Sequence, residues 1–312
     1  MLKRFYANKN DGSILIVGAD SMIGNALAET LKRSGRTVLE TTRRRELLSE
    51  NRIFLDLEQD ISSVRFPSKI SVAFLCAACD SLEYCHKEPL KTAKINVEAM
   101  VRLAEKLIKA GVFVVFFSTN LVYDGSVPCV KVDAPVSAQT EHGRQKAEAE
   151  RQMLPLGNLM AVLRLTKIFG PETHLLQEWI LALKSKKKIQ PFRDKVISPL
   201  LLSTAVQVSC RMIEKQLSGI VQVSSDQDVT YAQIAYRLAH RMRVRQDLVQ
   251  PVLASESGLF IEHLPQNTTF DTTRLVKELG IKPLKVWSVI DTVIDQNLDI
   301  FKRKGCAELL TS

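Results

Sequence analysis

Apolar runs and amphipathic segments alternate along the first half of the chain. Six short runs are rich in apolar residues, at 13–18, 36–42, 52–57, 71–78, 112–119 and 159–165. The segments between them, such as 22–35 and 89–110, carry apolar residues at helical spacing. Continuously apolar strands separated by helices are typical of a parallel sheet that is covered on both faces. The pattern therefore predicts an α/β fold with a Rossmann-type, doubly wound parallel sheet.

The pattern changes after Gly170-Pro171, where helical spacing dominates. Helices are expected at 174–186, 203–216, 230–243, 270–281 and 285–301, with one strand at 219–225. A smaller, mostly helical C-terminal lobe is therefore predicted to cap the ligand edge of the sheet. The expected parts are a flexible lead at 1–12, a dinucleotide-binding domain at 13–166 to which 203–225 returns, and a substrate-binding lobe at 167–202 and 226–312.

Composition indicates a globular chain with a sizeable core, since 46% of its 312 residues are hydrophobic and 25% are charged. The longest uncharged apolar runs, VAFLCAAC and VFVVFF, are too short to span a bilayer. The basic N-terminal stretch lacks the apolar region that is typical of a signal peptide. We therefore expect a cytoplasmic protein that does not enter membranes.

The cysteines raise the question of a metal site and the excess of basic residues that of nucleic-acid binding, but the sequence patterns favour neither. Cys76 and Cys79 form a C-x-x-C pair, and a zinc site would need a second matched pair, so we expect no metal and reduced thiols. The net charge is +9. The basic clusters at 43–45, 184–188 and 302–304 are short, separate and without interleaved aromatic residues, so nucleic-acid binding is not expected.

The stretch ILIVGADSMIGNAL joins the first predicted strand to the first predicted helix. Gly18 ends the strand and Gly24 lies in the first helical turn, which favours a pyrophosphate bound at the helix N-terminus. Ser21 occupies the middle position of a G-x-x-G-x-x-G fingerprint, where its hydroxyl can donate a hydrogen bond. Contacts with the cofactor are expected from Gly18, Ser21, Met22, Ile23 and Gly24. An ordinary strand-to-helix turn is the alternative.

Two arginines, Arg43 and Arg44, follow the second predicted strand in the stretch TTRRR. An acidic residue at this point commonly holds the ribose hydroxyls of NAD, but the nearest acid, Glu40, lies within the strand pattern. Arg43 and Arg44 could grip a 2′-phosphate through charge-assisted hydrogen bonds. We therefore predict NADP(H) as the cofactor in preference to NAD(H). The alternative is a pair of solvated arginines in a loop.

Several motifs resemble the extended short-chain dehydrogenase/reductases and, among them, the dTDP-4-dehydrorhamnose reductase group. The matching stretches are FLDLEQD, FLCAACDSLEYCHKEPLKTAKINVEAMVRLAEKLIKAG, FFSTNLVYDG, RLTKIFGP, DKVISP and FDTTRLVKELGI. The resemblance implies an enzyme that binds NAD(P)H and reduces a keto group on a nucleotide-linked sugar or a related small anionic substrate. It is also compatible with a homodimer.

The resemblance assigns roles to individual residues. Thr119 falls at the catalytic Ser/Thr, which bonds the substrate oxygen, and Lys146 falls at the active-site Lys, which holds the nicotinamide ribose. Asn120 stands where the group usually has Asp and would contact substrate, as would Tyr84 if it approaches the site. Further contacts with the cofactor are expected from Asp56, Leu57, Ala77, Ala78, Asn96 and Ser118. The alternative for Thr119 is a hydroxyl bonded to backbone, and for Asn96 a buried amide bonded to a neighbouring loop.

His142 stands where the group has its catalytic Tyr, four residues before Lys146. If an imidazolium replaces the Tyr as proton donor, reduction should decline as pH rises through the imidazolium pKa, which is ordinarily about 6.5. Lys146 should disfavour the charged form. The alternatives to an active reductase are an NADP-binding regulatory or scaffolding protein, and a sugar-modifying enzyme with non-standard proton chemistry at His142.

Overall fold

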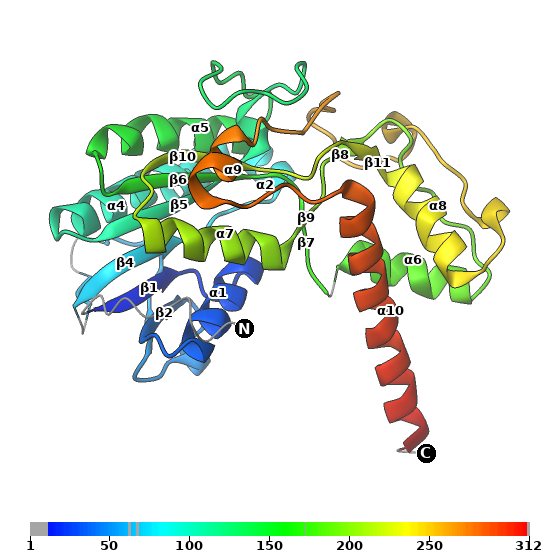
Figure 1. The fold of residues 1–312 in the computed structure, drawn as a ribbon, viewed down its shortest axis with the longest axis horizontal. Coiled ribbons are helices and arrows are strands. Elements are labelled where there is room, and N and C mark those ends of the chain that lie inside the picture. Colours follow the sequence, from blue (N-terminus) through cyan, green and yellow to red (C-terminus); the bar gives the residue numbers. More distant parts are fainter. Residues whose placement is uncertain (1–11, 62–63, 67–68, 172, 311–312) are drawn as a thin grey trace.

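The computed structural model describes residues 12–61, 64–66, 69–171 and 173–310, and the side chains of these residues as far as 301. The chain forms a larger part built on a sheet and a smaller helical part beside it (Figure 1). Of the predicted lead at 1–12, all but Gly12 lies outside the described residues.

Within the described residues, a parallel sheet of seven strands forms the centre of the larger part, in the order β10-β6-β5-β4-β1-β2-β3. The strands are β1 (Ser13–Val17), β2 (Val38–Thr42), β3 (Arg52–Phe54), β4 (Ile70–Leu75), β5 (Phe113–Thr119), β6 (Met160–Leu165) and β10 (Gly219–Val223). Because β1 pairs in parallel with both β2 and β4, the strand order reverses at β1. The carboxyl ends of the strands leave a crevice for a ligand at such a switch point. The predicted Rossmann-type sheet is confirmed.

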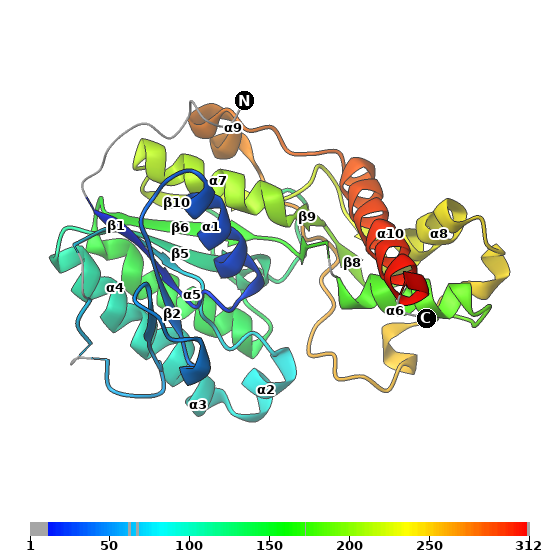
Figure 2. The ribbon, with the colours of Figure 1, turned by 90° about the horizontal axis from the view of Figure 1, so that it is seen from below.

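Helices cover both faces of the sheet, and Figure 2 shows α7 and α4 on opposite sides. One face carries α1 (Met22–Arg33), α7 (Leu202–Lys215) and α9 (Thr273–Leu279), and the other carries α3 (Pro89–Ala93), η3 (Lys94–Ala99), α4 (Met100–Lys109) and α5 (Glu141–Met153). In β1, Ile14 and Ile16 belong to the first core and Leu15 and Val17 to the second. A strand buried on both faces therefore appears in the sequence as a continuous apolar run.

The smaller part has a separate core. Its main helices are α6 (His174–Lys184), α8 (Tyr231–Met242) and α10 (Val286–Leu310). They pack through residues such as Ile180, Leu238 and Val289, which are all fully buried. Short strand pairs lie where the two parts join, namely β7 (Ile168–Phe169) with β9 (Leu200–Leu201) and β8 (Val196–Ile197) with β11 (Val229–Thr230). No helix in the described part of the chain is long and apolar enough to cross a membrane.

The remaining elements are short. They are α2 (Leu82–Lys87) and the 3₁₀ turns η2 (Arg45–Leu47), η4 (Asn120–Val122), η5 (Leu154–Leu156), η6 (Gln246–Leu248) and η7 (Ala254–Glu256). Several features differ from the sequence prediction. The short strands β8, β9 and β11 accompany the one strand that was expected after Gly170, and α10 continues to Leu310, beyond the expected end at 301. The helix expected at 89–110 is interrupted by η3, which is a π-helical turn, and α9 packs on the sheet core through Leu275 and Leu279, although its residues were grouped with the lobe.

A buried ion pair fixes α5 against the sheet. Arg164 in β6 places Nη2 2.5 Å from Oε2 of Glu150 on α5, and both side chains are 3% exposed. The Tyr123 hydroxyl and Arg164 Nη1 both donate to Oε1 of Gln222, over 3.1 Å and 3.2 Å. A buried pair of this kind is costly to break. The network therefore holds α5, which carries two of the predicted catalytic residues, in one position.

Candidate active site

The turn between β1 and α1 has no room for a side chain at its two glycines. Gly18 has a φ of +83°, and a Cβ there would lie 2.7 Å from Ala77 in the loop after β4. A Cβ at Gly24 would overlap the carbonyl oxygen of Gly18. Glycine at both positions therefore lets the turn pack tightly on the loop after β4 and on the start of α1, whose N-terminal N–H groups can bind a phosphate. The turn fits the pyrophosphate of a dinucleotide.

Ser21 closes this turn and does not obstruct it. Its Oγ donates to the carbonyl oxygen of Gly18 over 2.8 Å and accepts from the N–H of Gly24 over 3.1 Å, so Ser21 is the N-cap of α1. The N–H groups of Met22 and Ile23 lie in the first helical turn, where the helix dipole favours an anion. The Ser21 hydroxyl, which the sequence suggested as a hydrogen-bond donor, thus bonds within the turn.

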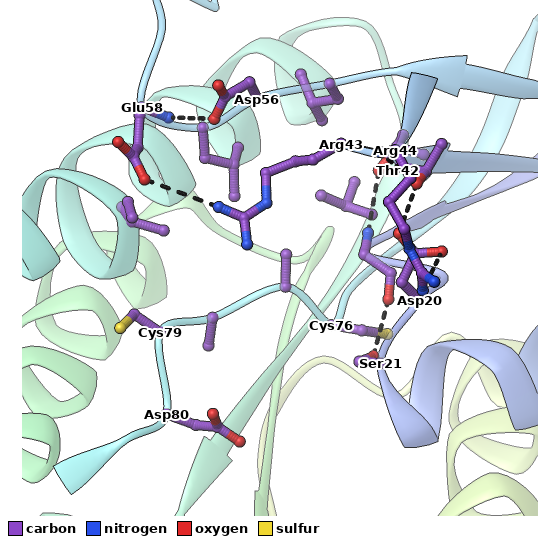
Figure 3. Close-up of a pocket in the computed structure, with 18 of the residues that line it drawn as sticks. Asp20, Ser21, Thr42, Arg43, Arg44, Asp56, Glu58, Cys76, Cys79 and Asp80 are labelled. Atoms are coloured by element: carbon purple, nitrogen blue, oxygen red, sulfur yellow. Dashed lines mark hydrogen bonds and ion pairs between the residues drawn. The ribbon is translucent and has the colours of Figure 1, made fainter. Parts of the chain in front are cut away.

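A cavity of about 920 Å³ lies at the switch point, among the ends of β1, β2 and β4 (Figure 3). Its lining includes the predicted contacts Gly18, Ser21, Met22, Arg43, Arg44, Asp56, Leu57, Ala77, Ala78 and Tyr84. It also includes residues that the sequence prediction missed, among them Asp20, Thr42, Glu58, Cys79 and Asp80. Both its place in the fold and its volume suit a dinucleotide.

Carboxylates hold the two arginines that follow β2. Arg43 extends across the cavity toward Glu58, with Nη1 3.7 Å from Oε1, and Arg44 has Nη2 3.3 Å from Oδ1 of Asp20 (Figure 3). Both arginine side chains are more than half exposed. They can therefore turn toward a phosphate group in the cavity.

Glu40 cannot take the place of an acid at the end of β2. Its side chain is 6% exposed and lies inside the strand, as the apolar pattern indicated. Its Oε2 lies 2.7 Å from Nε of Arg52, and Lys32 contacts the other oxygen. Both of its oxygens are therefore engaged with basic side chains away from the strand end.

Asn96 holds the loop after β4 in place. It lies in the π-helical turn η3 and is fully buried. Its Oδ1 accepts from the N–H of Cys79, and its Nδ2 donates to the carbonyl oxygen of Cys79 and to Oε1 of Gln145, each over 2.8 Å. The two bonds to Cys79 match the alternative role given above for Asn96, that of a buried amide bonded to a neighbouring loop. The residue shapes the cavity through the loop that it fixes.

His142 lies in the first turn of α5, behind the same loop. Only 6% of the residue is exposed, and Nδ1 lies 3.2 Å from the carbonyl oxygen of Cys79. Because a carbonyl oxygen only accepts, this hydrogen bond assigns the ring proton to Nδ1. Burial and then the charge of Lys146 lower the pKa of His142 to about 4. At neutral pH the ring is therefore uncharged, with its lone pair on Nε2.

Lys146 follows His142 by one helical turn and reaches the end of β5. Its Nζ donates to the carbonyl oxygen of Phe117 over 2.8 Å and lies 4.3 Å from the centre of the Phe116 ring. Burial lowers the pKa of Lys146 to about 8, against an opposing effect of Glu150. The amine is thus a buried cation at neutral pH, close to the residues that end β5.

Thr119 is the last residue of β5, and its Oγ1 accepts from the N–H of Leu121 over 3.2 Å. Among the described residues its hydroxyl hydrogen has no acceptor. Gly143 brings α5 close to this strand end, because a Cβ there would overlap the carbonyl oxygen of Leu121. Ser118 Oγ is buried and has no hydrogen-bond partner among the described residues. Asn120 is half-buried at the start of η4.

Of the tyrosines that the structure describes, only Tyr84 lines the cavity. Tyr123 is bonded within the buried ion-pair network and Tyr231 belongs to the core of the smaller part. Tyr236 lies on α8. Tyr84 does line the cavity, and Lys91 lies over its ring at 5.9 Å.

The C-x-x-C pair lies on the cavity wall around the two alanines. Burial raises the pKa of the Cys76 thiol well above its usual range, and burial also raises the pKa of the Cys79 thiol. Both groups therefore remain protonated at neutral pH. In the part of the chain that the structure describes, no group of three His, Cys, Asp or Glu residues is placed to hold a metal ion.

Comparison with known proteins places these features in a family. The RmlD substrate binding domain matches residues 12–298. Methionine adenosyltransferase 2 subunit beta of Bos taurus is 21% identical over 281 residues, covering 86% of this chain and 82% of its own. dTDP-4-dehydrorhamnose reductase of Aggregatibacter actinomycetemcomitans is 24% identical over 286 residues, covering 86% and 94%.

Solved structures show the same fold. MoeE5 in complex with UDP-glucose and NAD has a TM-score of 0.75 at 21% identity, covering 93% of this chain and all of that one. dTDP-4-dehydrorhamnose reductase from Bacillus anthracis in complex with NADP has a TM-score of 0.76 at 18% identity, covering 91% and 99%. The resemblance seen in the sequence is confirmed, and this chain belongs to the RmlD substrate binding domain family, within the extended short-chain dehydrogenase/reductases.

Proposed function

We propose that this protein is an NADPH-dependent reductase of a keto group on a nucleotide-linked sugar or a related small anionic substrate. The glycine turn and the cavity support a dinucleotide cofactor, and the exposed Arg43 and Arg44 support the 2′-phosphorylated form. The names of similar structures include UDP-glucose with NAD, and NADP alone. The net charge of +9 favours an anionic substrate.

When bound, the nicotinamide would supply the hydride. Thr119 can donate its hydroxyl hydrogen to the substrate carbonyl oxygen, because that hydrogen has no acceptor among the described residues. Lys146 contributes a cation that stabilises negative charge developing on that oxygen. The amine would also hold the hydroxyls of the nicotinamide ribose.

Proton transfer is the step at which this chain departs from its group. In reduction the substrate oxygen must gain a proton, and neutral His142 has its proton engaged with the carbonyl of Cys79. The imidazolium form can donate from Nε2, but a pKa of about 4 makes that form rare at neutral pH. We therefore infer slow reduction at neutral pH that accelerates under acid conditions.

A second candidate follows from the same observation. A neutral His142 is a poor acid, so this chain could be a regulatory protein that binds the cofactor in the cavity without reducing a substrate. Methionine adenosyltransferase 2 subunit beta, which is named as a subunit, is among the similar proteins. The free lone pair on Nε2 is, in contrast, suited to a base. A sugar-modifying reaction in which His142 removes a proton is consequently the third candidate.

The observation that most supports the reductase is the joint arrangement of Lys146 and His142. Lys146 is bonded to the end of β5 and His142 to the loop that lines the cavity. Cofactor binding alone would account for Lys146, so the titratable ring of His142, one helical turn before it, is the part of this arrangement that favours proton chemistry. Both side chains belong to α5, which packs against β5 and η4.

The test begins with thermal shift of the full chain with NADPH and a panel of nucleotide sugars, followed by loss of NADPH absorbance with any 4-keto sugar that stabilises it. Lys146→Met should lower turnover by about 10²–10⁴-fold, whereas Lys109→Met, which removes an exposed lysine from α4, should leave it unchanged. If no nucleotide sugar stabilises the NADPH-bound chain, the regulatory candidate gains and the reductase is rejected.

A further inference from the structure

Asp20 carries a carboxylate from the glycine turn to the end of β2, where the sequence pattern showed no acid. Thr42, the last residue of β2, donates its hydroxyl hydrogen to Oδ2 of Asp20 over 2.5 Å. The other oxygen, Oδ1, lies 3.3 Å from Arg44 and 3.8 Å from Arg52. Figure 3 shows Asp20 beside Thr42 and Arg44 at the cavity.

Buried tethers to β2 keep the glycine turn, and with it Asp20, in this position. The N–H of Gly18 donates to Oγ1 of Thr41 over 3.0 Å, and the N–H of Ala19 donates to the Thr41 carbonyl oxygen over 3.1 Å. Thr41 and Thr42 are each 2% exposed. The Asp20 side chain is 24% exposed and so remains open to a ligand.

We propose that Asp20 is a specificity-determining residue that weakens the preference of this chain for NADP(H) over NAD(H). An acid at the end of β2 is the group that holds the ribose hydroxyls of NAD in Rossmann proteins. In this chain the acid comes from the glycine turn and reaches the same strand end. It can accept a hydrogen bond from an unphosphorylated ribose and repels a 2′-phosphate. The inference rests on the dinucleotide cofactor of the proposed function.

The arginines of the cavity strengthen this argument, because each already has a carboxylate partner. Arg44 is paired with Asp20 and Arg43 with Glu58. A 2′-phosphate must draw the arginines from these partners, and it must also approach the Asp20 charge. An unphosphorylated ribose needs neither change. The preference for NADP(H) should therefore be weaker than the presence of Arg43 and Arg44 alone would indicate.

The experiment is calorimetric titration of the full chain with NADPH and with NADH at one fixed ionic strength, since salt screens these charges. Asp20→Asn keeps the size of the side chain and removes its charge. We expect NADPH to bind about tenfold more tightly and NADH more weakly, so the two affinities move in opposite directions. Titration with adenosine 2′,5′-bisphosphate should show the same gain without any nicotinamide.

Two further variants separate position from charge. Thr42→Val keeps Asp20 charged and removes its buried tether, so the NADPH/NADH affinity ratio should rise by less than in Asp20→Asn. Glu29→Gln removes an equal charge from α1, where Glu29 forms an exposed pair with Arg33 at 3.7 Å. This control should leave the ratio unchanged.

Equal changes in both affinities in Asp20→Asn, or a change no larger than that in Glu29→Gln, would overturn the proposal. Thermal unfolding of each variant shows whether the fold is intact. This test does not depend on the proposed reductase activity, because the role of Asp20 can be measured in a chain that binds NADPH and reduces no sugar. A chain that binds neither NADPH nor NADH overturns both.

Discussion

Reduction by this protein should depend on pH in a way that differs from an enzyme with a catalytic Tyr. The proton donor would be the imidazolium of His142, whose pKa is lowered to about 4 by burial and by Lys146. At neutral pH, about three units higher, only about one molecule in a thousand carries that proton. The rate should rise about tenfold for each unit by which pH falls toward 5. The sequence alone placed this decline near the ordinary imidazolium pKa.

The assay is single-turnover loss of NADPH in the presence of a substrate, between about pH 5 and pH 8. His142→Asn retains an N–H that can donate to the Cys79 carbonyl but has no titrating group, and it should lose about 10²–10⁴-fold in rate at the acid end. His142→Tyr should raise the rate at neutral pH, because a phenol with a pKa of about 10 stays protonated. NADPH affinity should change little in either variant.

A rate of reduction that is independent of pH in the unaltered chain would refute this reasoning, as would full activity in His142→Asn. Stability limits the acid end of the assay. The folded pKa of His142 is below its unfolded value, so its contribution to stability is present above about pH 6.5 and is lost as pH falls toward 4. Unfolding should be followed at each pH, with the slope in this window reduced in His142→Asn.

Three further variants test other parts of the molecule. Gly24→Ala should lower the affinity for NADPH by about tenfold or more in calorimetry, because the added methyl overlaps a carbonyl oxygen of the turn. The double change Arg43→Ala with Arg44→Ala should weaken NADPH and leave NADH nearly unchanged, and equal losses would contradict the role of the pair. Arg164→Met should cost about 3–5 kcal/mol in urea unfolding, because Glu150 keeps a buried charge without its partner, and Glu150→Gln in the same chain should recover part of the loss.

The sheet could be predicted because its central strands, such as β1 and β5, are buried on both faces and so appear in the sequence as apolar runs. The glycine turn was also readable, since Gly18 and Gly24 leave no room for a Cβ. The bounds of α6 and α8 were predicted from spacing to within two residues, whereas α10 continues nine residues beyond its expected end at 301. The placement of α9 was not, because Leu275 and Leu279 would suit either core and only tertiary packing decides between them.

The candidate site was harder to predict because its contacts cross long stretches of sequence. Asp20 and Thr42 are 22 residues apart, and no local pattern shows that the glycine turn carries an acid to the end of β2. The influence of Lys146 on His142 was expected from their spacing. Burial lowers the pKa of His142 more than Lys146 does, and the ring is buried behind the loop that Asn96 holds in place.

The carbonyl oxygen of Cys79 links the unusual histidine to the rest of the site. It accepts from Nδ1 of His142 over 3.2 Å, from Nδ2 of Asn96 over 2.8 Å and from Sγ of Cys85 over 3.3 Å. Removing His142 therefore leaves this carbonyl with two donors, so the loop has no buried acceptor without a partner. The loop can keep its shape in His142→Tyr, and a change in rate would then report proton transfer and not collapse of the cavity. The bond from Nδ1 to this carbonyl fixes the imidazole tautomer, and the bonds from Asn96 and Cys85 hold the carbonyl in place, so the lone pair on Nε2 is a consequence of the fold.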